Sequence, residues 1–125
     1  MTPIETTRAL TYLIAYSNLR PMVSPSACME YLNAVAPIKE DSPEYNEIEY
    51  DFYLWWLTKR VNHWCDTQYQ ANQLLDLWTE LSRLTSDGRT IEGNITIGGI
   101  TYRYKALKAV LGDLLIDGLM RSLNK

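Results

Sequence analysis

The strongest candidates for a reactive or metal-binding site are His63 and Cys65, which form a His-x-Cys sequence with Asp66 directly after it. A histidine and a thiolate can ligate a metal ion, and a histidine can activate a nearby cysteine as a nucleophile. His63 is, however, the sole histidine, and side chains two positions apart on a helix point about 200° away from each other. We therefore interpret His63 as a helix-end residue and Cys65 as a core residue. We predict no metal ligand, no cofactor and no catalytic residue.

Two groups of carboxylates offer another kind of chemistry, because paired acids can exchange protons with a substrate. They are Glu44, Glu47, Glu49 and Asp51 in one predicted helix, and Asp113 and Asp117 in another. The first group also suits the positive end of a helix dipole, and the second suits a solvated strip on a helix surface. A small enzyme built on these acids or on Cys65 is therefore the last of the functions that we consider.

Basic residues gather around a predicted β-hairpin, where they could form a wing that contacts DNA. They are Arg89, Arg103, Lys105 and Lys108. The net charge of −3 is not the electrostatic footprint of a nucleic-acid-binding protein, and charged residues at a strand edge also discourage aggregation. We therefore do not expect a nucleic-acid partner, and we keep a DNA-binding regulator as the alternative function.

The composition is typical of one globular domain spanning residues 1–125, with 46% hydrophobic and 22% charged residues. The N-terminus has no basic segment followed by an apolar one, and no run approaches the ~18 apolar residues of a membrane span. We therefore expect a cytoplasmic protein without a membrane partner. Cys28 and Cys65 fit two free thiols in a reducing compartment, and one disulfide between them is an open alternative.

Three helix starts share one pattern, a hydroxyl residue followed by proline. Thr2-Pro3, Ser24-Pro25 and Ser42-Pro43 each place a capping oxygen at the N-cap and a proline at the first helical position. Together with the apolar periodicity, these signals predict helices at about 3–19, 25–36, 43–64, 66–86 and 105–122. The fold class is therefore α+β and mostly α, with the helices arranged around the aromatic segment 43–64.

The predicted helix 43–64 has two apolar faces. Tyr45, Ile48, Phe52, Trp55 and Trp56 share one face, and Tyr50, Tyr53, Leu54, Leu57, Val61 and Trp64 share the opposite one. Narrow polar strips separate the faces, one of them containing Glu49 and Arg60. A helix that is apolar on two sides is buried on two sides, so this helix should lie between other elements or against a partner. No strong breaker follows it; we expect a bend near residues 65–67, and one continuous helix is the alternative.

The apolar period changes from 3.6 to 2 between about residues 90 and 104, which predicts a β-hairpin. Gly98-Gly99 suits a two-residue type I′ turn, and this stretch has no Walker lysine. The turn pairs Ile97 with Ile100 and Ile95 with Tyr102. The isoleucine face must then lie on the helices, because a lone hairpin is marginally stable in water.

The last predicted helix also has two apolar stripes, one of which contains Ala109, Ile116, Met120 and Leu123. Gly112 and Gly118 lower its helix propensity by about 1 kcal/mol each relative to alanine, which suggests close approach of a neighbouring backbone. The order of helix, short hairpin and helix over the last third of the chain resembles that of a small phage head–tail joining protein. This likeness of pattern suggests a phage origin, includes no diagnostic residues and carries no function with it.

A second apolar stripe on two helices favours a protein–protein interface, since tyrosine and tryptophan are enriched at such surfaces. We predict a non-enzymatic protein-binding protein, an adaptor, assembly factor or inhibitor of another macromolecule. A homodimer is the expected form, because a two-fold axis uses one surface twice. The predicted interface residues are Tyr50, Tyr53, Trp64, Ile116, Met120 and Leu123.

Overall fold

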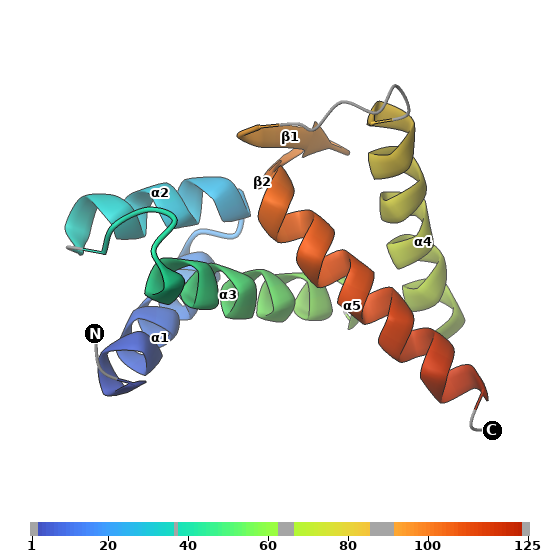
Figure 1. Ribbon diagram of the computed structural model, residues 1–125, viewed down its shortest axis with the longest axis horizontal. Helices are drawn as coiled ribbons and strands as arrows, with labels where there is room; N and C mark the ends of the chain where they lie inside the picture. The colour runs from blue at the N-terminus through green and yellow to red at the C-terminus, as the bar shows by residue number, and fades with distance from the viewer. Residues whose placement is uncertain (1–2, 37, 63–66, 86–91, 124–125) are drawn as a thin grey trace.

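The computed structural model describes residues 3–36, 38–62, 67–85 and 92–123, with side chains for 5–36, 38–59, 73–85 and 92–117 (Figure 1). The helices are α1 (Pro3–Leu19), α2 (Pro25–Val35), α3 (Pro43–Asn62), α4 (Thr67–Leu84) and α5 (Tyr104–Leu123). An antiparallel hairpin of β1 (Asn94–Ile97) and β2 (Ile100–Arg103) precedes α5. The predicted α+β fold class and the predicted order of elements are confirmed.

The hydroxyl caps form as predicted at two of the three helix starts. Ser24 Oγ accepts the backbone N–H of Ala27 at 3.3 Å, and Ser42 Oγ accepts that of Tyr45 at 3.2 Å. Each cap satisfies one of the free N–H groups in the first turn of its helix. The predicted cap Thr2 lies outside the described residues.

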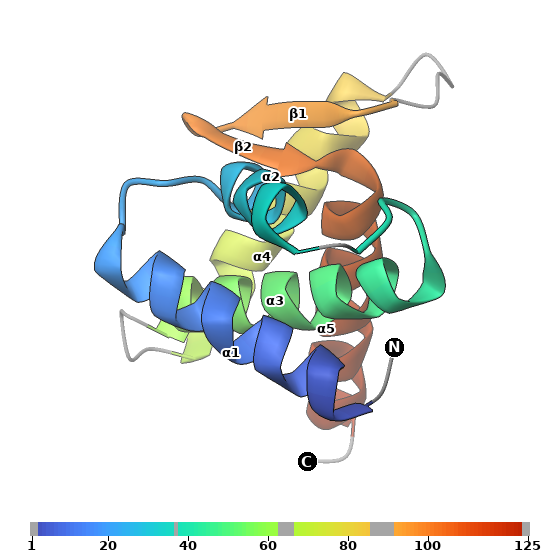
Figure 2. The same cartoon turned by 90° about the vertical axis from the view of Figure 1, so that its left-hand side faces the viewer.

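Helix α3 is the centre of the core, with α1 on one side and α5 on the other (Figure 2). Its buried residues come from both of its predicted apolar faces: Tyr45, Ile48 and Phe52 from the first, and Tyr53 and Leu57 from the second. The prediction of a helix buried on two sides is therefore confirmed. Burial of large aromatic side chains contributes most of the driving force in such a core.

The hairpin has the predicted register, with Ile97 opposite Ile100 and Ile95 opposite Tyr102. Gly98 and Gly99 adopt φ values of 60° and 78°, which the type I′ turn requires and which glycine accepts without strain. Ile95 and Tyr102 are buried, whereas Thr96 is exposed. The hydroxyl oxygens of Thr96 and Thr101 are 3.0 Å apart and share a hydrogen bond. The isoleucine face thus lies on the helices, as expected.

The junction between α3 and α4 was predicted to bend, and residues 63–66 lie outside those described. The two helices run in clearly different directions (Figure 1). Leu81 of α4 is buried, and Leu74, Leu77 and Trp78 pack against the core, so one side of α4 faces the core.

The C-terminal helix α5 divides into a covered side and an open side. Leu107, Val110 and Leu111 are completely buried against the core. Ala109 and Ile116, from the second predicted stripe, are exposed. Among the described side chains, both predicted apolar faces of α3 supply buried residues, whereas the second stripe of α5 is exposed at Ala109 and Ile116.

Candidate interaction surface

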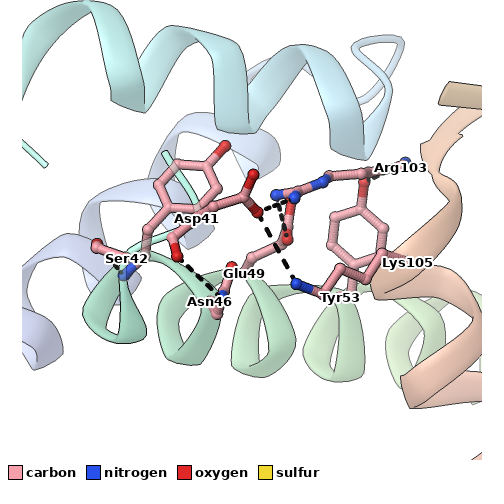
Figure 3. Close-up of polar contacts among 8 residues, drawn as sticks. Asp41, Ser42, Asn46, Glu49, Tyr53, Arg103 and Lys105 are labelled. Atoms are coloured by element: carbon pink, nitrogen blue, oxygen red, sulfur yellow. Dashed lines mark hydrogen bonds and ion pairs between the residues drawn. The ribbon is translucent and has the colours of Figure 1, made fainter. Parts of the chain in front are cut away.

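Arg103, the last residue of β2, contacts residues of α3 and of the loop that precedes α3 (Figure 3). Its guanidinium donates to Glu49 Oε1 at 3.0 Å and to Asp41 in the loop before α3. Its backbone N–H donates to the Tyr53 hydroxyl at 2.7 Å. The guanidinium carbon also lies 5.9 Å from the ring centre of Tyr45. One arginine therefore joins the hairpin, α3 and the loop in front of it.

The backbone geometry explains why these groups meet. Tyr45, Glu49 and Tyr53 are four residues apart on α3 and so form one stripe along its surface. Arg103 pairs with Asn94 in a non-hydrogen-bonded position of the ladder, so its N–H points away from β1. The Tyr53 hydroxyl satisfies this edge N–H. Asp41 has φ 66°, a left-handed conformation that aspartate tolerates better than most residues.

The electrostatics of this cluster are governed by burial. The side chain of Glu49 is only 4% exposed, and that of Arg103 is 14% exposed. Desolvation raises the pKa of Glu49 above its ordinary value, although the charge of Arg103 opposes the shift. Desolvation alone would lower the pKa of Arg103, but the bond to Asp41 and the charge of Glu49 outweigh it and raise that pKa. Glu49 therefore depends on Arg103 to remain ionised inside the protein.

The placement of Glu49 and Arg103 corrects two interpretations of the sequence. The sequence pattern puts Glu49 with Arg60 on a polar strip and assigns its charge to the helix dipole, whereas Glu49 is buried and its countercharge comes from Arg103, 54 positions away. Arg103 was a candidate contact to DNA, but its guanidinium is already occupied by two carboxylates. Of the other basic candidates, Lys105 and Lys108 are exposed, and Arg89 lies outside the described residues.

The six predicted interface residues are distributed between the core, the surface and the undescribed part of the chain. Tyr53 is 1% exposed and belongs to the core, so it offers no surface to a partner. Tyr50 is half-buried, and its hydroxyl donates to Asp113 of α5. Ile116 is 63% exposed. The side chains of Trp64, Met120 and Leu123 lie outside those described.

Ala109, Gly112 and Ile116 follow one another along the outer side of α5 and line a groove of about 780 Å³. We call these three residues the α5 outer face. Trp78 of α4 and Lys108 also line the groove. Ile116 borders a second hollow of about 430 Å³, which it shares with Tyr50 and other residues of α3 and α5. The first groove is also lined by the charged residues Asp41, Glu92, Arg103, Lys105 and Asp113.

Another groove, of about 760 Å³, runs between α1 and α2. Tyr12 and Val35 line it and are 43% and 54% exposed. The Tyr12 hydroxyl donates to that of Tyr31 at 2.8 Å, and their rings stack 5.9 Å apart. Ala15 and Leu19, three and seven positions after Tyr12 on α1, are exposed too, whereas Leu13 is completely buried, so this side of α1 faces away from the core.

The described residues do not form a reactive or metal-binding site. Cys28 is a free, buried thiol, and burial raises its pKa to about 11, only partly opposed by a hydrogen bond with Ser17. Such a thiol is not a nucleophile near neutral pH. No group of three or more His, Cys, Asp or Glu side chains suitable for a metal occurs within the described residues. His63, Cys65 and Asp66 lie outside them.

Comparison with known proteins gives no relative: no family model, no curated protein and no solved structure matches this chain. The likeness to the phage joining protein thus stays one of element order. In the part of the chain that the structure describes, no helix is long and apolar enough to cross a bilayer.

Proposed function

We propose that this protein is a non-enzymatic interaction protein that forms a homodimer through the α5 outer face and serves as an adaptor, assembly factor or inhibitor of another macromolecule. The observation that carries the proposal is the exposure of Ile116, a large aliphatic side chain that is 63% accessible between two hollows. A single exposed aliphatic residue is ordinary. Here Ile116 continues a stripe with Ala109 and Gly112 along α5, and an exposed apolar stripe on a helix is typical of a surface that another protein covers.

The described residues give weaker support to catalysis and to DNA binding. Catalysis would need a reactive group, and the described thiol of Cys28 is buried. DNA binding would need free cations, and Arg103 is bound by Glu49 and Asp41. Burying an apolar helix face requires neither, and aliphatic centres with charged rims are typical of protein interfaces.

Sedimentation velocity of the whole chain, at several concentrations, tests the proposal. The wild type should sediment as a dimer, and Ile116→Asp should sediment as a monomer with unchanged helicity. The matched control is Leu75→Asp, since Leu75 is a comparably exposed aliphatic residue, 53% accessible, on α4. A monomeric wild type at every concentration, or equal effects of the two substitutions, would contradict the proposal.

DNA binding is the second candidate, because Lys105 and Lys108 are exposed and both line the α5 groove. Their cationic character is limited, since Lys105 Nζ lies 3.9 Å from Asp41 Oδ1 and Lys108 Nζ lies 5.7 Å from the Tyr104 ring centre. Retention on heparin at physiological salt, lost on replacing both lysines with alanine, would favour this function. Elution in the flow-through at that salt concentration would contradict this function.

A further inference from the structure

We infer that the open edge of β1 binds an extended segment of another protein, which adds to the hairpin as a third strand. The inference rests on the proposed role of the chain as a protein-binding protein, and it does not depend on the homodimer, because this edge belongs to the hairpin and not to α5. Three observations carry it: the open backbone of β1, the closed edge of β2, and the uncharged sequence of the strand.

The position of β1 leaves one of its edges without a strand neighbour. In the described part of the chain, the sheet has two strands in the order β1–β2. α2 packs against β2, and β2 lies between β1 and α2, so β1 is the outermost strand (Figure 2). An edge strand of this kind is a template for the pairing of a further strand.

The register shows which backbone groups this edge presents. The two-residue turn makes Ile97 and Ile100 a hydrogen-bonded pair, and the two kinds of position then alternate along the ladder. Asn94 and Thr96 therefore direct their N–H and C=O groups away from β2. Both residues are exposed, and no described residue hydrogen-bonds to these outward groups. The edge thus offers donors and acceptors at alternate residues, which is the pattern that an extended chain matches.

The opposite edge of the hairpin is closed by the fold itself. Arg103 of β2 lies opposite Asn94, and its N–H likewise points out of the hairpin. This N–H donates to the Tyr53 hydroxyl at 2.7 Å. The fold therefore supplies a partner for the outward N–H of Arg103 on β2, whereas the described residues supply none for the outward groups of β1.

The sequence of β1 does not oppose the addition of a strand. Charged side chains, proline and bulges protect edge strands from pairing. The strand reads Asn-Ile-Thr-Ile, which contains no charge and no proline and is rich in the β-branched residues that favour strands. The register is regular over all four residues, without a bulge. Such a strand is suited to pairing with another uncharged extended segment.

The length of β1 indicates the kind of partner that covers it. Its four residues suit the binding mode in which a short peptide strand gains its affinity from main-chain hydrogen bonds. They offer far less than the roughly 800 Å² per partner that a standard protein interface buries. A second copy held only through β1 would therefore not form a stable dimer, and a short segment of another protein fits the edge better.

The groove beside α5 adds a preference for side chains. Glu92 and Gly93, which directly precede β1, line this groove together with Trp78 and Ile116. A Cβ atom at Gly93 would meet no atom within 4 Å, so the space at this end of β1 is open. The fitting partner is thus an extended segment of alternating polar and aliphatic residues, with a large apolar side chain at the end beside the groove.

Titration of short synthetic peptides into the isotope-labelled chain tests the inference. The peptides alternate threonine with isoleucine, valine or leucine, with phenylalanine at one end or the other and lysines outside for solubility. Binding should slow amide exchange at Asn94 and Thr96 by about tenfold or more, whereas Ile95, whose N–H already faces β2, should change little. Absence of binding by every peptide, or equal protection of Ile95 and Thr96, would overturn the inference.

Backbone methylation of the best peptide separates strand addition from other binding. N-methyl groups on one alternate set of residues should weaken binding by about tenfold or more, because they remove the N–H groups that face β1. N-methyl groups on the other set should have little effect, and equal effects of the two sets would overturn the inference.

Two variants test the edge from the side of the protein. Thr96→Pro removes the outward N–H but none of the hydrogen bonds between β1 and β2, and it should weaken binding by about tenfold or more. The matched control, Thr96→Val, keeps this N–H and should bind like the wild type. If Thr96→Pro does not fold, the methylated peptides still decide the matter with the wild-type chain.

These outcomes separate the inference from the proposed homodimer. If the wild type sediments as a dimer that Ile116→Asp dissociates and no peptide binds, the homodimer stands and the inference is wrong. If protection of Asn94 and Thr96 rises with protein concentration alone, a second copy covers the edge, and the inferred partner is wrong.

Discussion

Removing the guanidinium of Arg103 should destabilise the fold more than any single surface substitution. In Arg103→Met the methionine replaces most of the buried stem but leaves Glu49, whose side chain is 4% exposed, without a countercharge. Breaking one partner of a buried ion pair costs about 3–5 kcal/mol. The contact with Asp41 adds little, because that carboxylate is 58% exposed and screened by water. We therefore expect a loss of about 3 kcal/mol, out of the roughly 5–15 kcal/mol typical of a domain.

Glu49→Gln is the matched companion to Arg103→Met. The amide keeps the shape and one acceptor for the guanidinium while removing the buried negative charge, so we expect a change within about 1 kcal/mol. In the double variant, the loss caused by Arg103→Met should shrink to about 1 kcal/mol. The four unfolding free energies from urea titration give the coupling directly, and the slopes of the titrations should agree.

The pH dependence separates this electrostatic account from a simple packing loss. The pKa of Glu49 is higher in the folded state than in the unfolded state. Protonated Glu49 therefore adds to the stability of the fold below its unfolded-state pKa, and this contribution is lost as the pH rises through its folded-state pKa. Removing Arg103 raises the folded pKa further, and protonation then relieves the buried charge. The deficit of Arg103→Met should therefore be smaller near pH ~5 than near pH ~7. A loss below about 1 kcal/mol at neutral pH, or a deficit independent of pH, would refute the reasoning.

Three further predictions follow from the same structure. Tyr53→Phe should cost about 1–2 kcal/mol, since the edge N–H of Arg103 loses its acceptor; that amide should exchange faster with solvent, and unchanged exchange would contradict the assignment. Gly99→Ala should cost about 1–2 kcal/mol in urea titration because φ is 78°; a neutral effect would exclude the type I′ turn. Burial raises the pKa of Tyr45 to about 12 and that of Cys28 to about 11, so the stability they contribute is complete below their ordinary pKa values and lost as pH rises through 11–12. The phenolate absorbance of Tyr45, taken as the difference between the wild type and Tyr45→Phe, should then increase together with the loss of helical circular dichroism. A difference that already appears near pH ~10 with the fold intact would argue against the burial of Tyr45.

Much of the fold could be predicted because its determinants are local. Ser24 and Ser42 mark helix starts through hydrogen bonds within one turn. Gly98-Gly99 fixes the hairpin register through the conformation of two adjacent residues. Neither signal depends on knowing what lies across the molecule.

The contacts between distant segments could not be predicted in the same way. The sequence pattern indicates that both apolar faces of α3 are buried, but it does not indicate which element covers each face. Tyr53 was therefore assigned to an interface, although the core encloses it. The partnership of Glu49 with Arg103 spans 54 positions, and a sequence pattern does not report which charges a fold will bring together. The sequence suggests that a neighbour approaches Gly112 closely, but only the structure shows that this neighbour is the Trp78 ring of α4, 3.7 Å from where a Cβ atom would lie.

Hydrogen exchange of the wild-type chain at low and high protein concentration tests the central claim most directly. Association through the α5 outer face should slow exchange of the backbone amides around Gly112 and Ile116 as concentration rises, because docking suppresses local opening of the helix. Amides around Leu75 of α4 should exchange at the same rate at both concentrations. Protection that increases around Leu75, or nowhere in α5, would contradict the account.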